Sequence, residues 1–330
     1  MVKYIIRTFA SQTLRTPQRT GQLQKSMNTK KTLTEQTNEI LKSRMSANKK
    51  AQALVKLGVT PYEAMILAKS SLTTAELRSP RAFSYTFGVE IECVGCRYNE
   101  FFTAARNNGL EVMTQVYYNH NDIPQYKLTT DSSISGQNAA ECVTPALNGN
   151  ASGFESLKNC CKSLREIGAT ANSSCGLHVH IGAASLTDEE YCNVFVNYMR
   201  LETAIESFLA PSRRGLYARW CKSLRTNENA VLAATTKVGM CNALHCDRYH
   251  RVNANAYSAH KTIEFRQHQG TTNYTKIEHW VKFLGKLVEW SRDNRLNENI
   301  DRIEDIPFLA DAEKTFFCNR RAEFEARSAR

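Results

Sequence analysis

The stretch Gly88-Val89-Glu90-Ile91-Glu92 alternates apolar side chains with carboxylates. The same alternation recurs in Gly176-Leu177-His178-Val179-His180 and in Thr262-Ile263-Glu264-Phe265-Arg266. On a β-strand, successive side chains point to opposite faces, so each stretch buries its apolar residues and presents charged or imidazole groups on the other face. A surface strand would usually carry Thr, Lys or Ser there. The three stretches therefore predict three strands whose polar face carries the chemistry of the protein.

Helix signals surround these strands. Thr187 and Glu190 form a capping box that predicts a long helix, and Pro211 is expected to stop it. Apolar residues at helical spacing predict further helices at about residues 100–108, 154–167 and 277–288.

Shorter strands are expected at residues 111–118 and 125–130, followed by a hairpin from Asp131 to Pro145. Polar-faced strands together with amphipathic helices predict an α+β protein. In this fold class we expect an antiparallel sheet with helices packed on one face, while the other face is open and polar.

The positive charge of the chain is concentrated near its N-terminus. Residues 1–80 hold 14 of the 43 Lys and Arg and 4 of the 32 Asp and Glu, a net charge of +10. Residues 81–330 hold the remaining 29 basic and 28 acidic residues, a net charge of +1. Ser79-Pro80 is the expected boundary. We therefore expect a basic N-terminal extension over residues 1–80 and a catalytic domain over residues 81–330.

The extension combines an arm with short helices. Residues 1–33 show no sustained hydrophobic period, so we interpret them as mostly disordered. One helix is expected from Thr34 to Gly58, and Thr60-Pro61-Tyr62-Glu63 signals the start of another. The extension could bind nucleic acid through its charge or dock an assembly partner. Its acid-free beginning fits either a transit peptide or a plain basic arm.

Eleven cysteines lie between positions 93 and 318. Their odd number and the lack of a secretory hydrophobic segment favour reduced thiols and a cytoplasmic location. No apolar run approaches the roughly 18–20 residues that a membrane span requires. A zinc site could combine Cys93-x-x-Cys96 with Cys241 and Cys246, or with His245 and His250; the alternative is that the thiols are inert.

The carboxylates of the first strand need a counter-charge. Glu90 and Glu92 would lie about 7 Å apart on a strand, and two carboxylates at that distance repel by roughly 2 kcal/mol at an effective dielectric constant near 20. Adding Asp131, Glu141 and Glu264 to the same surface would multiply this cost unless cations are present. A cluster of oxygen ligands suits Mg²⁺. Taken alone, Glu-x-Glu is more typical of a solvated edge strand.

The other two strands offer different groups. His178 and His180 would share one face, where one imidazole among carboxylates can complete an Mg²⁺ or Mn²⁺ site; two surface histidines are an equal alternative. Arg266, two residues after Glu264, could recognise phosphate or carboxylate, or simply form an ion pair. His268 is expected further along the same face.

Five motifs occur in an order that resembles the amidoligase family. They are Gly-x-Glu-x-Glu from Gly88, Asp-x-Ser from Asp131, Glu-x-Val-x-Pro from Glu141, Gly-Leu-His-Val-His from Gly176, and Glu-Phe-Arg-x-x-x-Gly-Thr from Glu264. The resemblance runs from about Phe87 to Thr271 and extends to the helix that follows. The family comprises ATP-dependent carboxylate–amine ligases related in fold to glutamine synthetase and to glutamate–cysteine ligases. The resemblance therefore implies a glutamine synthetase-like antiparallel sheet.

Carried over residue by residue, the resemblance also implies roles. Its catalytic residues would be Glu90, Glu92, His178 and Arg266, with Arg266 contacting phosphate. Its metal ligands would be Glu90, Glu92, Asp131, Glu141, His178, His180 and Glu264. Pro211-Ser212-Arg213-Arg214 resembles a family feature in which Arg213 or Arg214 could bind phosphate or a substrate carboxylate, a solvated basic loop being the alternative. Arg251 and Asn253 are weaker candidates for the nucleotide side.

The implied reaction transfers the γ-phosphoryl group of ATP to a carboxylate, and an amine then attacks the acyl phosphate to form an amide or isopeptide bond. Positioning and charge neutralisation by Mg²⁺ and Arg drive such chemistry, and no P-loop motif is present. The carboxylate and amine substrates stay open among amino acids, peptides, proteins and cell-wall components. A metal-dependent amide hydrolase on the same Glu/His face, and a non-enzymatic binding protein acting through residues 1–80, are the alternatives.

Overall fold

The computed structural model describes residues 32–43, 47–60, 64, 68, 85–118 and 121–328. The chain divides into two compact units, Met1–Arg81 and Ala82–Arg330. The arm expected over the first residues, and most of the helix expected after Thr60, lie outside the described residues. No described helix is long and apolar enough to cross a bilayer.

The described part of the first unit contains two helices where one was predicted. They are α2 (Leu33–Lys42) and α3 (Ala47–Lys56). The N-cap is Thr32 rather than Thr34, and it forms a capping box with Glu35. The single-helix prediction is wrong because Ser43 adopts an extended backbone and its hydroxyl donates to the Ile40 carbonyl at 2.6 Å, which ends α2.

The second unit is built on a seven-stranded antiparallel sheet in the described residues. Its strand order is β2-β3-β1-β5-β7-β6, with β4 also paired to β1. The three alternating stretches form its centre as β1 (Thr86–Cys93), β5 (Gly176–Gly182) and β7 (Thr262–Gln269). The other strands are β2 (Lys127–Thr129), β3 (Ala140–Val143), β4 (Leu147–Asn148) and β6 (Val252–Asn253). The predicted antiparallel sheet is therefore confirmed, whereas its likeness to glutamine synthetase stays a prediction.

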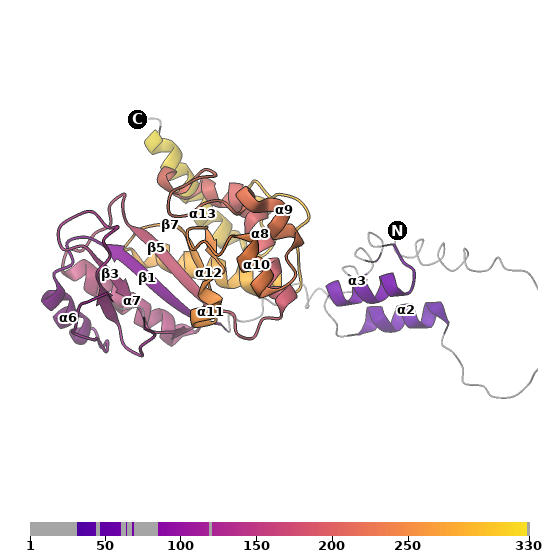
Figure 1. Cartoon of the computed structure of the whole chain (residues 1–330), viewed down its shortest axis with the longest axis horizontal. Helices are drawn as coiled ribbons and strands as arrows, with labels where there is room; N and C mark the ends of the chain where they lie inside the picture. Colours follow the sequence, from indigo (N-terminus) through magenta and orange to yellow (C-terminus); the bar gives the residue numbers. More distant parts are fainter. Residues whose placement is uncertain are drawn as a thin grey trace, which may run out of the picture. The chain divides into compact units, whose positions relative to one another are not determined.

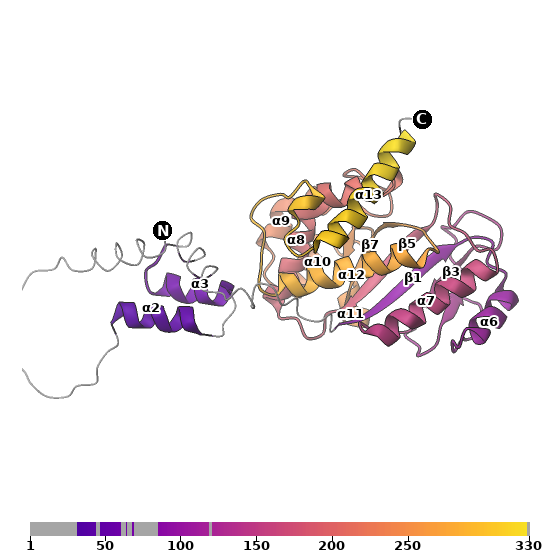
Figure 2. The same ribbon diagram turned by 180° about the vertical axis from the view of Figure 1, so that it is seen from behind.

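Helices α7 (Ala151–Glu166) and α12 (Tyr274–Ser291) lie across one face of β1 and β5, as the two opposite views show (Figure 1, Figure 2). The apolar residues of the alternating strands, such as Val89, Leu177 and Phe265, are fully buried in the main core on this side. Burying a side chain of this size contributes about 1.5–3 kcal/mol. The remaining helices of this unit are α6 (Tyr98–Asn107), α8 (Asp188–Ser207), α9 (Glu228–Ala233), α10 (Lys237–Ala243), α11 (Ala256–His260) and α13 (Asp311–Ser328).

Several local signals are confirmed. The hydroxyl of Thr187 accepts the Glu190 N–H, and the Glu190 carboxylate accepts the Thr187 N–H, so the capping box starts α8. Helix α8 ends before Pro211, which begins a short 3₁₀ turn, Pro211–Arg213. The strand predicted near residues 125–130 forms β2, which pairs with β3 so that Thr129 lies opposite Glu141. The hairpin predicted within Asp131 to Pro145 is wrong, because β3 is the one strand in that range and its partner β2 precedes Asp131.

Two strand predictions need correction. Residues 111–118 form only an isolated bridge between Val112 and Tyr126, because the segment makes no continuous ladder. A register shift interrupts the pairing of β5 with β7 between Leu177 and Val179. This bulge takes His268 off the expected face, and its ring packs against Trp280 of α12 at 5.5 Å between ring centres. Burial there lowers the pKa of His268 to about 3.

Candidate active site

Strand register sets the polar residues of the sheet directly opposite one another. Glu90 pairs with His178 across β1 and β5, and His180 pairs with Glu264 across β5 and β7. On the other side of β1, Glu92 pairs with Glu141 of β3. Directly opposed residues have Cβ atoms about 4.5–5.5 Å apart. Antiparallel pairing therefore gathers groups that lie far apart in the sequence.

His178 lies at the centre of four carboxylates. Its Nδ1 is 2.9 Å from Glu90 Oε2, and its Nε2 is 3.5 Å from Glu92 Oε1. Nδ1 is also 3.9 Å from one carboxylate oxygen each of Glu141 and Glu264. No more than 5% of the surface of His178, Glu92, Glu141 and Glu264 is exposed. These four side chains are therefore largely shielded from bulk solvent.

His180 bridges the same cluster from its far side. Its Nε2 lies 3.4 Å from Glu90 Oε1, and its Nδ1 lies 2.8 Å from the hydroxyl of Thr262. Burial alone would lower the pKa of His180, but the hydrogen bond and charge of Glu90 outweigh it and raise that pKa. The same contacts act in reverse on Glu90: although burial opposes it, hydrogen bonds from His178 and His180 hold its pKa well below the usual range.

Glu264 is held by partners on both sides. Its Oε1 pairs with Arg266, and its Oε2 accepts a hydrogen bond from Asn253 Nδ2 at 2.6 Å. Burial raises its pKa, but the positive charge of Arg266 and the nearby His180 bring it below the ordinary value. Glu264 is therefore fixed in position as a carboxylate.

The pKa of Glu141 reflects its burial among other carboxylates. Burial, followed by the charges of Glu90, Glu92 and Asp131, raises its pKa well above the ordinary value. Glu92 is compensated by the Gly176 N–H, which donates to its Oε2 at 2.5 Å. Without an added cation, the cluster thus carries more negative charge than its own partners neutralise.

The side chains fit a metal centre by donor type and by spacing. Three groups of three residues have ligand atoms within 4.8 Å of one another. Oxygen donors dominate, with one imidazole in two of the groups, which suits Mg²⁺ or Mn²⁺. The groups are Glu90, His180 and Glu264; Glu90, Glu141 and His178; and Glu92, Asp131 and Glu141. They bring together all seven ligands that the sequence predicts.

Two cavities meet at this cluster. The larger has a volume of about 490 Å³ and the smaller about 260 Å³. Glu141 lines both, Glu92 and His178 line the larger, and Glu90 and His180 line the smaller. Each cavity thus opens onto one part of the candidate metal centre.

Two buried guanidinium groups line the larger cavity. Arg213 exposes 4% of its surface and Arg266 5%. Arg213 donates to the Cys175 carbonyl at 2.6 Å, and a Cβ at Gly176 would lie only 3.2 Å from its Nη2 and 3.0 Å from His178 Nε2. Gly176 therefore allows both groups to lie against the strand. Buried Arg266 Nε has no hydrogen-bond partner, so the hydrogen-bonding capacity of this guanidinium is not fully used by the side chains around it.

Comparison with family models finds a match to the family described as "Putative amidoligase enzyme", over residues 84–288. The match covers more than half of the chain and includes every candidate ligand. The chain belongs to the amidoligase family. The resemblance read from the five motifs is thereby confirmed. No curated protein matches the amidoligase sequence significantly.

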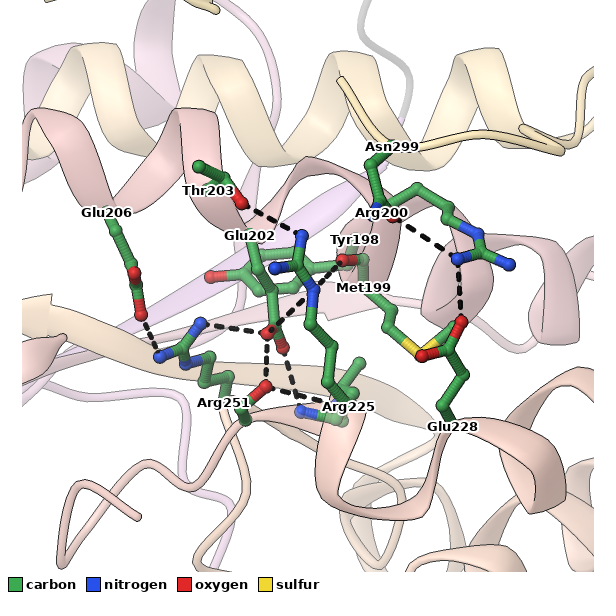
Figure 3. Close-up of polar contacts among 12 residues, drawn as sticks. Tyr198, Met199, Arg200, Glu202, Thr203, Glu206, Arg225, Glu228, Arg251 and Asn299 are labelled. Atoms are coloured by element: carbon green, nitrogen blue, oxygen red, sulfur yellow. Dashed lines mark hydrogen bonds and ion pairs between the residues drawn. The ribbon is translucent and has the colours of Figure 1, made fainter. Parts of the chain in front are cut away.

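Two arginines expected near the nucleotide are engaged elsewhere in the amidoligase. Arg251 lies in a buried network, where its Nη1 is 2.9 Å from Glu202 Oε2 and its Nη2 pairs with Glu206 (Figure 3). Arg214 donates from Nε and Nη2 to the Leu209 carbonyl at 2.8 and 2.6 Å. Neither lines one of the two cavities described above, so the structure does not bring these two arginines together with the candidate metal ligands.

Other lining residues escaped sequence reasoning. Trp220 and Tyr249 form one wall of the larger cavity, with ring centres 5.3 Å apart, and the guanidinium of Arg266 lies 5.9 Å from the Tyr249 ring. Lys127, in the smaller cavity, is 5% exposed and donates to the Asn121 carbonyl at 2.7 Å. The sequence signal that could have identified Lys127 was its position between the buried apolar residues Tyr126 and Leu128. Trp220 and Tyr249 lie in loops, where no hydrophobic periodicity marks them.

The zinc interpretation is not supported. Among the described residues, the groups able to hold a metal contain no cysteine. His245 Nε2 and His250 Nε2 instead contact the side chain of Asn227 at 3.2 and 3.3 Å. Cys93 and Cys96 are buried in the main core.

Proposed function

We propose that this amidoligase is an ATP- and Mg²⁺-dependent carboxylate–amine ligase that forms an amide or isopeptide bond through an acyl phosphate. The observation that carries the proposal is the position of seven metal-capable side chains between two cavities, with Arg213 and Arg266 buried in the larger one. Family membership favours this chemistry over amide hydrolysis and over a purely binding role.

Mg²⁺, or Mn²⁺, would be held by the three ligand groups described above. Bound there, the cations would neutralise the triphosphate and the developing charge of phosphoryl transfer. Their binding would also relieve the repulsion that raises the pKa of Glu141. The two cavities would give the nucleotide and the second substrate separate entrances to the centre.

In the first step, a carboxylate oxygen of the substrate attacks the γ-phosphorus of ATP, and ADP leaves with the electrons of the broken P–O bond. Arg266 would stabilise the oxygens of the transferring group through its unpaired Nε and its charge. Arg213, on the same cavity, would bind either these oxygens or the substrate carboxylate.

In the second step, the amine nitrogen attacks the acyl carbon, a C–N bond forms and phosphate leaves. An acyl phosphate is sensitive to water, so the enclosed site supports this order of events. His178, Glu92 and Glu141 each expose 5% of their surface or less, which limits the water that can compete with the amine.

The decisive experiment follows ADP release with pairs of carboxylates and amines in the presence of Mg²⁺. A ligase releases ADP and phosphate only when ATP, Mg²⁺ and both substrates are present. Cleavage of amides without ATP would instead identify a hydrolase. Before substrates are known, thermal stabilisation by Mg²⁺ with a non-hydrolysable ATP analogue tests the nucleotide site; the absence of any such shift would overturn the proposal.

A further inference from the structure

Helix α10 ends in a Schellman motif that brings two cysteines together. The Cys246 N–H donates to the Cys241 carbonyl at 2.8 Å, and the His245 N–H donates to the Asn242 carbonyl at 2.9 Å. These are the two hydrogen bonds that define the motif, and they place its first and last residues side by side. The φ angles of His245 and Cys246, 56° and 51°, provide the left-handed turn that closes it. Backbone geometry thus sets Cys241 against Cys246.

The two thiols are in contact. Cys241 Sγ lies 3.1 Å from Cys246 Sγ. It also lies 2.8 Å from Asn255 Oδ1, while Asn255 Nδ2 donates to the Cys246 carbonyl. Asn255 therefore holds both ends of the motif together. Only a small movement of the two sulfur atoms is needed for them to form a disulfide bond.

Access distinguishes this pair from the other thiols. Eight of the eleven cysteines are buried, whereas Cys246 is exposed and Cys241 and Cys318 are partly exposed. A second pair, Cys142 and Cys160, has its sulfur atoms 3.6 Å apart but lies wholly in the core. Cys241 and Cys246 thus combine proximity with solvent access among the eleven cysteines.

We propose that Cys241 and Cys246 are an oxidation site at which a peroxide forms a reversible intramolecular disulfide. The exposed Cys246 thiolate attacks the O–O bond of hydrogen peroxide, giving a sulfenic acid and one water after proton transfer. The Cys241 sulfur then attacks the Cys246 sulfur, an S–S bond forms and a second water leaves. Overall, two thiols and one peroxide yield one disulfide and two waters, and a dithiol reductant reverses the change.

The environment of Cys241 indicates which thiol reacts first with peroxide. Burial, together with the neighbouring Cys246 thiol, raises the pKa of Cys241 to about 11. The raised pKa disfavours the Cys241 thiolate, so Cys246 is the sulfur that attacks peroxide and Cys241 is the one that resolves the sulfenic acid. The loop that follows leads through Arg248 to Tyr249, both of which line the larger cavity. The modification would thus lie beside the candidate active site, although the proposal does not depend on its reaction.

The test uses the full chain, treated with one equivalent of hydrogen peroxide, alkylated and digested with trypsin without reduction. Residues 238–248, between Lys237 and the cleavage at Arg248, contain both cysteines and no others. We expect this peptide to escape alkylation and to weigh about 2 Da less than its reduced form, the mass of two hydrogen atoms. Dithiothreitol should restore both alkylation sites.

Variants make the assignment specific. Cys246→Ser should abolish the mass loss and leave Cys241 alkylated, whereas Cys318→Ser, at a partly exposed thiol, should leave the disulfide unchanged. The Cys142–Cys160 pair should stay reduced. A peptide 238–248 that stays unoxidised under these conditions would overturn the proposal. So would oxidation of Cys246 to a sulfinic acid with Cys241 still free.

Discussion

Glu90 and His178 lie 88 positions apart in the sequence, yet register makes them direct partners across β1 and β5, with Oε2 2.9 Å from Nδ1. Glu90 also contacts His180 through its other oxygen and belongs to two of the three metal-capable groups. The Glu90 carboxylate is therefore shared by the ligand group that contains His178, which lines the larger cavity, and the group that contains His180, which lines the smaller one.

The first prediction concerns this shared carboxylate. Glu90→Gln keeps the side-chain shape but removes the charge on which two ligand groups depend, so ATP-dependent amide formation should fall by about 100-fold or more. Steady-state ADP release measures this. Glu155→Gln is the matched control, because Glu155 is an exposed residue of α7 paired with Lys158. Comparable loss in both variants would contradict a specific role for Glu90.

The second prediction concerns pH and metal removal. The raised pKa of Glu141 means that the folded, metal-free protein keeps a proton that the unfolded chain loses near its ordinary pKa of about 4.3. Stability in EDTA should therefore decline as pH rises above that value. Glu141→Gln removes this decline, so the variant should have the higher urea midpoint at pH 8 and no advantage near pH 4.

Metal provides the control for that experiment. Mg²⁺ should raise the urea midpoint of the wild type more than that of Glu141→Gln, since the variant lacks one carboxylate ligand. A variant that is no more stable than the wild type at pH 8 in EDTA would contradict the raised pKa of Glu141 that burial and the neighbouring carboxylates produce.

The third prediction separates neighbouring arginines. Arg213 lines the larger cavity, whereas Arg214 donates to the Leu209 carbonyl away from it. Lysine keeps the charge but loses the planar fork. Arg213→Lys should lower kcat/KM by about 10-fold or more, and Arg214→Lys should leave it nearly unchanged. Equal effects of the two substitutions would contradict the assignment of Arg213 to the site.

The sequence was sufficient for what depends on alternation alone. Glu90, His178 and Glu264 could be assigned to one face because strand side chains alternate whichever strand lies next to them. Alternation does not reveal which residues of neighbouring strands lie opposite each other, so the pairing of Glu92 with Glu141 could not be predicted. His268 was misplaced for a related reason, because β7 has one extra residue between its pairings with Val179 and Leu177, and alternation in the sequence does not reveal this bulge.

Arginines posed a different problem. Whether Arg213 or Arg214 enters the cavity depends on how a short 3₁₀ turn is rotated, which residue types do not reveal. Arg251 precedes the last strand and was a weaker candidate for the nucleotide side; its side chain turns towards acidic residues of α8 (Figure 3). Aromatic walls such as Trp220 and Tyr249 come from aperiodic loops and become visible only in three dimensions.

The last prediction concerns the buried ion pair between Arg251 and Glu202. Arg251 and Glu202 each expose 1% of their surface, and Glu202 also accepts hydrogen bonds from the Ser223 hydroxyl and the Leu224 N–H. Arg251→Met would leave the buried Glu202 charge with Arg225, whose Nε lies 3.9 Å from Glu202 Oε2, as its more distant cation. The free energy of unfolding should therefore fall by about 3–5 kcal/mol. Urea denaturation, followed by circular dichroism, measures the loss.

Arg200→Met is the matched control for Arg251→Met, because Arg200 lies on α8, the helix that carries Glu202. Arg200 lies 2.7 Å from Glu228, whose side chain is 40% exposed, so water can replace the lost partner (Figure 3). We expect that variant to lose about 0–1 kcal/mol. Glu202→Leu combined with Arg251→Met should recover part of the larger loss, because no unpaired charge then remains buried. A double variant less stable than Arg251→Met alone would mean that Glu202 stabilises the fold through its hydrogen bonds to Ser223 and Leu224 rather than through the ion pair.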